Sequence, residues 1–133
     1  MNSNTTTLTL ITSKSDHIRE AANALRNICH FAAKTWWKKG DIEDKKTFAV
    51  KLCLIHSEVS EAMEGDRKNL KDDHLPHRDM REVELADAVI RIFDLAGAYG
   101  MDIGGAIAEK LQYNAKRADH KPEIRAAEGG KAY

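Results

Sequence analysis

The chain has few of the residues that interrupt helices or cross-link small domains. Of its 133 residues, two are proline and two are cysteine. The long segments between Pro76, Pro122 and the other expected breakpoints carry a helical rather than an alternating apolar period. With so little cysteine a disulfide framework is excluded, and we expect Cys29 and Cys53 to be buried free thiols in a reducing compartment. These absences favour an all-α protein.

The sequence also lacks a net charge and a long apolar run. Lys and Arg number 21 and so do Asp and Glu, so no overall field attracts a nucleic acid polymer or an acidic membrane surface. No stretch approaches the roughly 18 apolar residues that a membrane span requires, and the N-terminus lacks the basic start of an export signal. We therefore expect a soluble, cytoplasmic protein that binds neither a nucleic acid polymer nor a membrane.

At this length we expect one domain, built as a bundle of four to five helices. Residues 1–14 are rich in Thr and Ser and are predicted to be a flexible tail. Residues 15–117 form the predicted helical domain, and residues 118–133 a basic, Gly-containing tail. Gly40 and Gly100 are expected helix stops. The predicted helices run from Ser15 or Asp16 toward Trp37, from Lys45 to Asp66, from Asp79 to Tyr99 and from Ile103 to Arg117.

Apolar residues at helical spacing predict the core. The third helix is apolar over more than half of its circumference, which predicts a central position or a face shared with a second subunit, and hence a homodimer or homotetramer. Its one polar strip is Glu84, Asp87, Arg91 and Asp94. The expected core residues of the first three helices are Ile18, Ala22, Leu25, Cys29 and Ala33; Phe48, Leu52, Ile55, Val59 and Met63; and Ala86, Val89, Ile90, Phe93 and Ala96.

Two acidic pairs stand out, Glu58 with Glu61 and Glu84 with Asp87. Residues three apart on a helix project to nearly the same side, so two packed helices can present four carboxylates to one gap. Such acids repel one another unless a cation lies between them, and oxygen ligands suit magnesium or manganese. The alternative is two solvated helix faces. Glu82 is either a buried partner of this group or a residue of the helix boundary.

Two other groups of residues each have more than one interpretation. Lys110, Asn114 and Arg117 share a helix face, which suits an anion or an ordinary solvated surface. Trp36 and Trp37 diverge by about 100° if helical, so we expect one to pack while the other is free to stack on a base, unless it anchors the core or an interface.

Zinc and the common nucleotide-binding loops are not favoured. Neither a P-loop motif nor a G-x-G-x-x-G motif is present, so any nucleotide is expected to be held by helices. We expect His30 and His56 to be interior or helix-edge residues rather than metal ligands. The expected solvated linker residues, which superficially suggest zinc, are Asp72, Asp73, His74 and His77.

From residue 17 to residue 131 the chain resembles the MazG-like all-α nucleoside triphosphate pyrophosphohydrolases. The motif IHSEVSEAMEG with Glu58 and Glu61 looks like the family's E-x-x-E helix, and EVELADAVIRIFDLAG with Glu84 and Asp87 looks like its E-x-x-D helix. The resemblance implies that these four acids are catalytic and hold Mg²⁺ or Mn²⁺. It implies hydrolysis of a ribo- or deoxynucleoside triphosphate to the monophosphate and pyrophosphate.

The closing stretch EKLQYNAKR followed by GGK also looks like the family's last helix and basic tail. By that resemblance Lys110, Asn114 and Arg117 would contact substrate phosphates or sugar, and Trp36 would contribute to the nucleotide pocket. Family members often carry a further acid where this chain has Ser57. This difference supports an alternative, a non-catalytic helical protein that binds a nucleotide or a partner.

Overall fold

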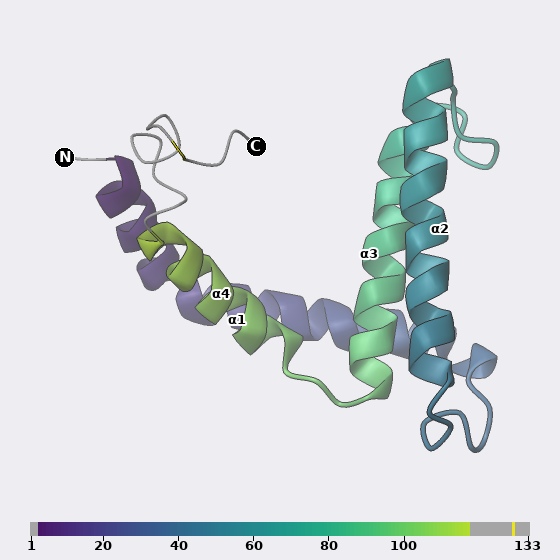
Figure 1. Ribbon diagram of the computed structural model, residues 1–133, viewed down its shortest axis with the longest axis horizontal. Helices are drawn as coiled ribbons and strands as arrows, with labels where there is room; N and C mark the ends of the chain where they lie inside the picture. The colour runs from purple at the N-terminus through teal and green to yellow at the C-terminus, as the bar shows by residue number, and fades with distance from the viewer. Residues whose placement is uncertain (1–2, 118–128, 130–133) are drawn as a thin grey trace. The chain divides into compact units, whose positions relative to one another are not determined.

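The structure is a computed structural model that describes residues 3–117 and residue 129. Its ordered elements are helices, as expected, and residues 3–117 contain no strand beyond an isolated bridge between Lys71 and Asp79. None of the helices in this part of the chain is long and apolar enough to cross a membrane. The elements are α1 (Ser3–Ala33), the 3₁₀ turn η1 (Lys34–Trp36), α2 (Thr47–Lys68), α3 (Met80–Ala98) and α4 (Ile103–Lys116) (Figure 1).

The chain divides into two compact units, and the boundary between them falls inside α1. The first unit comprises the residues up to Asn23 and those from Asp102 onward, with α4. The second unit comprises Ala24–Met101, with η1, α2 and α3.

Helix α1 begins at Ser3, so it extends through residues that we assigned to the flexible tail 1–14. Hydroxyl groups in this stretch bond within the helix: Thr9 Oγ1 donates to the Thr5 carbonyl oxygen at 2.9 Å, and Ser13 Oγ to the Leu10 carbonyl oxygen at 2.9 Å. These bonds satisfy the polar side chains without breaking the backbone ladder. The tail predicted at 118–133 lies outside the described residues apart from Gly129.

In the first unit, α1 and α4 approach closely at one glycine. A Cβ on Gly104 would lie 2.2 Å from the carbonyl oxygen of Arg19, so only glycine fits there. The Gly104 N–H donates to Asn23 Oδ1 at 2.8 Å, and Asn23 Nδ2 donates to Asp102 Oδ1 at 2.8 Å. Asp102 Oδ1 also accepts from the Gly105 N–H at 2.9 Å and so caps α4.

In the second unit, α2 and α3 lie side by side and run in opposite directions (Figure 1). They touch closely where a Cβ on Gly65 would meet Met80 Cβ at 2.9 Å. Gly100, with φ +63°, follows α3 as the expected stop. The second unit's core is made of small side chains and one leucine: Cys29, Ala62, Ala88, Leu95 and Ala96.

The predicted apolar stripe of α2 is not buried in the single chain. Val59 is 51% exposed and Met63 is 60% exposed, because α2 turns the face of Glu58, Ala62 and Gly65 inward instead. That face lies about 100° around the helix from the stripe. The expected burial was also wrong for these residues, which are exposed: Leu25, Leu52, Ala86, Val89, Ile90 and Cys53. Periodicity therefore identified an apolar face of α2 that is largely exposed in the single chain.

Candidate metal and anion site

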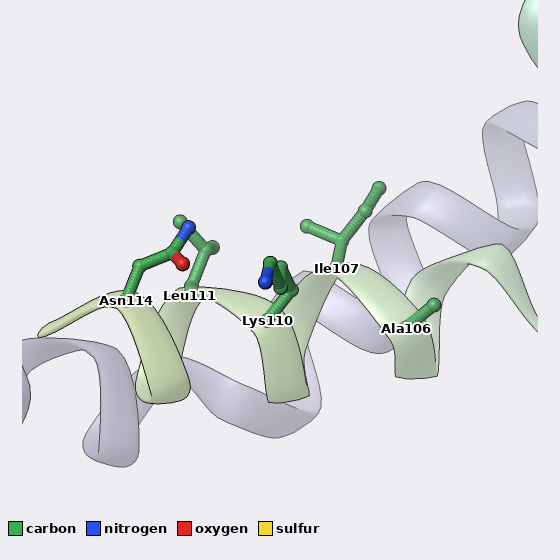
Figure 2. A pocket seen from close by; sticks show the side chains of 5 residues that line it. All are labelled: Ala106, Ile107, Lys110, Leu111 and Asn114. Atoms are coloured by element: carbon green, nitrogen blue, oxygen red, sulfur yellow. The ribbon is translucent and has the colours of Figure 1, made fainter. Parts of the chain in front are cut away.

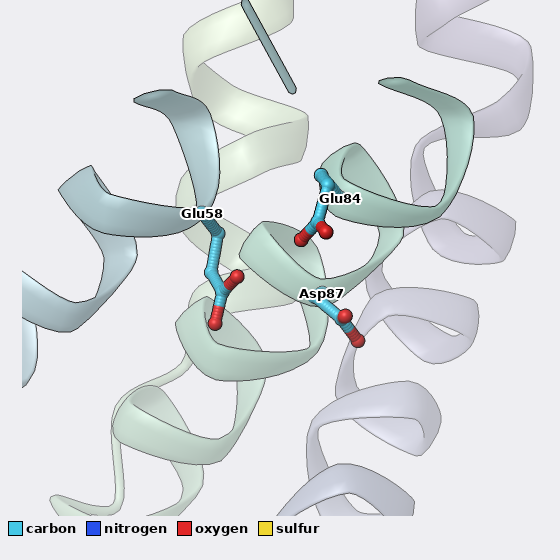
Figure 3. A group of neighbouring side chains, drawn as sticks. All are labelled: Glu58, Glu84 and Asp87. Carbon is cyan, nitrogen blue, oxygen red and sulfur yellow. The ribbon is translucent and has the colours of Figure 1, made fainter. Parts of the chain in front are cut away.

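Three acids from α2 and α3 come together in the second unit. Glu58 projects from α2, and Glu84 and Asp87 project from α3 (Figure 3). One carboxylate oxygen from each lies within 4.8 Å of the other two, which makes this the one group of at least three such acidic, His or Cys side chains among the described residues. We call these three residues the carboxylate cluster. The prediction that the two acidic pairs meet between packed helices is borne out for three of the four acids.

Glu61, the fourth acid, lies outside the cluster and is exposed. It is still near enough for its negative charge to raise the pKa of Glu84. The separation follows from the helix geometry, because residues three apart differ by about 60° around the axis. With Glu58 turned fully toward α3, Glu61 falls on the rim.

Glu58 is the most enclosed member of the cluster, with 7% of its surface exposed. Its Oε1 accepts a short hydrogen bond from Arg91 Nε, and the two side chains form an ion pair between α2 and α3. A buried carboxylate needs such a partner because burial disfavours its charged form. Arg91 is therefore part of the site's charge balance.

The pKa of Glu84 is raised to about 7. Burial is the main cause, followed by a hydrogen bond with Glu58 and by the negative charges of Glu61, Glu58 and Asp87. A carboxyl group with this pKa is partly protonated near neutral pH. The fold therefore brings these negative charges close enough together to change the pKa of Glu84.

The loop between α2 and α3 also acts on the cluster. The pKa of Asp87 is raised by burial and by Glu58, and further by Asp72, whereas Arg91 and His74 lower it. Asp72 is buried, and its Oδ2 accepts from the backbone N–H groups of His74 at 2.9 Å and Leu75 at 2.7 Å. Asp72 therefore organises the loop from a buried position, whereas we expected a solvated linker residue.

Beside the cluster is a cavity of about 280 Å³ with acidic, basic and aromatic walls. Lys51 and Arg91 supply positive charge, and Glu58, Asp87 and Asp94 negative charge. Trp36, Ala33 and Ile90 complete the lining. A second cavity of about 290 Å³ shares Trp36 and Lys51 with the first. The cavity therefore combines charged groups of both signs with an exposed indole ring.

The two adjacent tryptophans differ in burial, as we expected. Trp37 is half-buried. Its Nε1 donates to the Asp94 carboxylate and lies 3.0 Å from Oδ1 and 3.2 Å from Oδ2. Trp36 is 76% exposed at the cavity. His30 Nδ1 lies 2.9 Å from Asp94 Oδ1, so His30 is a half-buried partner of that acid, whereas His56 is exposed.

Lys51 was not among our candidates, and Arg91 and Asp94 were noted only as part of a polar strip. Arg91 and Asp94 follow Asp87 at one and two helical turns, so their spacing already indicated that they share one face of the helix with Asp87. Lys51 lies two turns before Glu58 on α2 and was recognisable in the same way. Glu82, in contrast, is exposed and pairs with Arg78 at 2.9 Å, so it is a boundary residue.

The predicted substrate contacts on α4 belong to the first unit. Lys110 and Asn114 line a groove of about 470 Å³ with Ala106, Ile107 and Leu111 (Figure 2). The guanidinium carbon of Arg117 lies 5.7 Å from the centroid of the Tyr113 ring. Lys110 Nζ lies 4.6 Å from the same centroid. The three residues therefore gather around one stretch of α4.

The carboxylate cluster has the oxygen donors that a hard divalent cation prefers. Three clustered carboxylates provide oxygen ligands, and two basic side chains face the adjoining cavity. Comparison of the chain with protein-family models, with curated proteins and with solved structures found no match in any of the three.

Proposed function

We propose that this protein is a magnesium-dependent nucleotide pyrophosphohydrolase, which cleaves a ribo- or deoxynucleoside triphosphate to the monophosphate and pyrophosphate. The observation that carries the proposal is the carboxylate cluster beside a cavity lined by Lys51, Arg91 and Trp36. The sequence resemblance to the MazG-like family supports the same reaction through Glu58, Glu61, Glu84 and Asp87.

The chemistry of the cluster fits a divalent cation. Repulsion among the acids contributes to holding the pKa of Glu84 near 7, and a cation between them would relieve it. All three are oxygen donors, which favours Mg²⁺ or Mn²⁺ over softer metals. Glu58, Glu84 and Asp87 would hold the ion, with Glu61 at the rim. When bound, such an ion neutralises charge on phosphate oxygens and lowers the pKa of water.

The remaining side chains of the cavity have roles that follow from their chemistry. Lys51 and Arg91 would bind phosphate oxyanions, since an ammonium and a guanidinium donate charge-assisted hydrogen bonds. The exposed ring of Trp36 would stack on the base. Lys110, Asn114 and Arg117 are proposed as further substrate contacts from the resemblance.

We also propose that the protein is a homodimer or homotetramer. The evidence is the apolar surface that the single chain leaves uncovered on α2 and α3, which includes Val59, Met63, Leu85 and Val89. Scattered apolar residues are normal on a surface, but a continuous stripe at helical spacing favours a partner. A second copy of the chain would cover this stripe.

The test is pyrophosphate release from a panel of ribo- and deoxynucleoside triphosphates with Mg²⁺, with Mn²⁺ and with chelator, identifying the nucleotide product each time. We expect monophosphate and pyrophosphate, lost when chelator is added. Phosphate and diphosphate as products would contradict the proposed bond cleavage.

A second candidate, a non-catalytic nucleotide- or partner-binding protein, is favoured by one observation. Ser57 stands where the family often has an acid, and its hydroxyl donates to the Leu54 carbonyl oxygen at 2.7 Å. Ser57 is thus engaged within its own helix. Binding of triphosphates without turnover by any member of the panel would select this candidate.

A further inference from the structure

The two partners of the Arg91–Glu58 ion pair differ in exposure. The Glu58 side chain is 10% exposed and held between α2 and α3, whereas the Arg91 side chain is 44% exposed. A long, flexible side chain at the surface changes rotamer at low cost, while an enclosed carboxylate does not. Arg91 is therefore the partner that can leave.

Arg91 also has donors to spare. A guanidinium carries five N–H groups, and the bond to Glu58 engages the one on Nε. Arg91 and Glu58 line the same cavity, together with Lys51 and Asp87. A ligand in this cavity is thus within the space that the guanidinium reaches by rotation about its own side-chain bonds.

Arg91 has two possible anionic partners, Glu58 and a phosphate group, and the presence of a metal ion decides between them. Without a metal ion, Glu58 needs the guanidinium as its counter-charge. A divalent cation on the cluster supplies that charge itself and repels the guanidinium. A phosphate group beside the ion then offers Arg91 a new anionic partner with the oxygen geometry that a guanidinium prefers.

Resting on the proposed function, we propose that Arg91 neutralises Glu58 while no metal is bound and turns to a phosphate oxyanion in the same cavity once a divalent cation occupies the carboxylate cluster. Arg91 would then compete with the metal for Glu58 and assist binding of the phosphate. Metal and phosphate would each favour the binding of the other.

The experiment measures Mn²⁺ binding by calorimetry, with and without inorganic triphosphate, for the wild type, Arg91→Gln and Arg91→Lys. Without triphosphate, we expect Arg91→Gln to bind Mn²⁺ about threefold to tenfold more tightly, because the competing charge is gone. With Mn²⁺ present, we expect it to bind triphosphate about tenfold more weakly, because a charge-assisted contact is lost. Arg91→Lys keeps the positive charge, so both of its affinities should lie closer to the wild-type values than those of Arg91→Gln.

Arg81→Gln is the matched control. Arg81 is also on α3 and its Nη1 pairs with Asp66 Oδ1 on α2 at 2.5 Å, but it does not line the cavity. We expect its affinities to stay within about twofold of the wild type, as for an exposed ion pair. Circular dichroism checks that each variant keeps its helices.

Two results would overturn the proposal: Arg91→Gln that binds Mn²⁺ no more tightly than the wild type, or triphosphate affinity that the substitution leaves unchanged. A wild type that binds no Mn²⁺ at all would instead remove the proposed function on which the inference rests. The three results are distinguishable because the wild-type titration is read before any variant.

Discussion

Glu61 and Asp87 have the same place in their sequence pairs but not in the structure. Asp87 lies in the carboxylate cluster, whereas Glu61 is exposed at its rim. Spacing alone treats both as equal ligands. The structure separates them, because Asp87 lies in the carboxylate cluster whereas Glu61 acts on Glu84 through its charge.

We therefore expect Asp87→Asn and Glu61→Gln to differ in effect. Asp87→Asn should lower Mg²⁺-dependent pyrophosphate release by about 100-fold or more, and Glu61→Gln by about tenfold, as for a residue outside the first set of ligands. The measurement is initial rate at saturating Mg²⁺, with helical content checked by circular dichroism. An equal loss in both variants would make Glu61 a direct ligand; full activity in Asp87→Asn would remove the cluster from catalysis.

The raised pKa of Glu84 predicts how the free energy of unfolding of the metal-free protein depends on pH. Its pKa is about 7 when folded, above the ordinary value of 4.5, so the folded state binds the proton more tightly than the unfolded state. The contribution of Glu84 to the free energy of unfolding is then greatest below about pH 4.5 and falls as pH rises to about 7. We expect Glu84→Gln to stabilise the metal-free protein at pH 8 by about 1–3 kcal/mol.

Urea denaturation of the wild type and Glu84→Gln, in chelator at several pH values between 5 and 8, measures this effect. The difference between the two proteins is the relevant quantity, since it cancels the titration of other groups. A difference that does not change between pH 5 and pH 8 would show that Glu84 titrates normally.

The junction of α1, η1 and α3 is held by a polar contact inside an aromatic group. Asp94 on α3 accepts from Trp37 after η1 and faces His30 on α1. The Trp37 ring makes edge contacts with His30 and Tyr99, with centroids 6.0 Å and 6.2 Å apart. One acid thus ties together three elements and also lines the cavity.

Trp37→Phe should destabilise this junction, and Trp36→Phe is its natural control. We expect Trp37→Phe to lower the free energy of unfolding by about 1–3 kcal/mol, because Asp94 loses a donor in a half-buried place. Trp36→Phe should change it by less than about 0.5 kcal/mol, since Trp36 is exposed. Chemical denaturation followed by circular dichroism measures both; equal effects would contradict the assigned roles.

Helix content was readily predicted, and helix faces were not. The stop at Gly100 and the start of α4 at Ile103 follow from local backbone preferences and match the structure. The start of α1 was missed because Thr and Ser residues have little helix propensity, although their hydroxyls bond within the helix here. Which face of α2 packs on α3 depends on contacts far apart in sequence, and periodicity does not report these.

The proposed contact between subunits through the exposed apolar stripe of α2 can be tested on the intact protein. We expect light scattering to give at least twice the chain mass of 14.9 kDa. Val59→Arg should shift the mass toward the monomer, because a charge would be buried at the contact. Ser57→Arg, on the opposite side of α2, should not. A wild-type monomer would contradict the proposed oligomer, and an oligomer unchanged in Val59→Arg would move the contact elsewhere.

The all-helical class, the approximate extent of the three later helices and the pairing of acids were readable from the chain because they depend on interactions within a few residues. The meeting of Glu58 with Glu84 and Asp87, the exclusion of Glu61, the Arg91–Glu58 ion pair and the burial of Trp37 rather than Trp36 were not. These depend on how each helix is rotated against its neighbour. A spacing of three residues places two acids on one side of a helix, but packing between helices selects which of them faces the site.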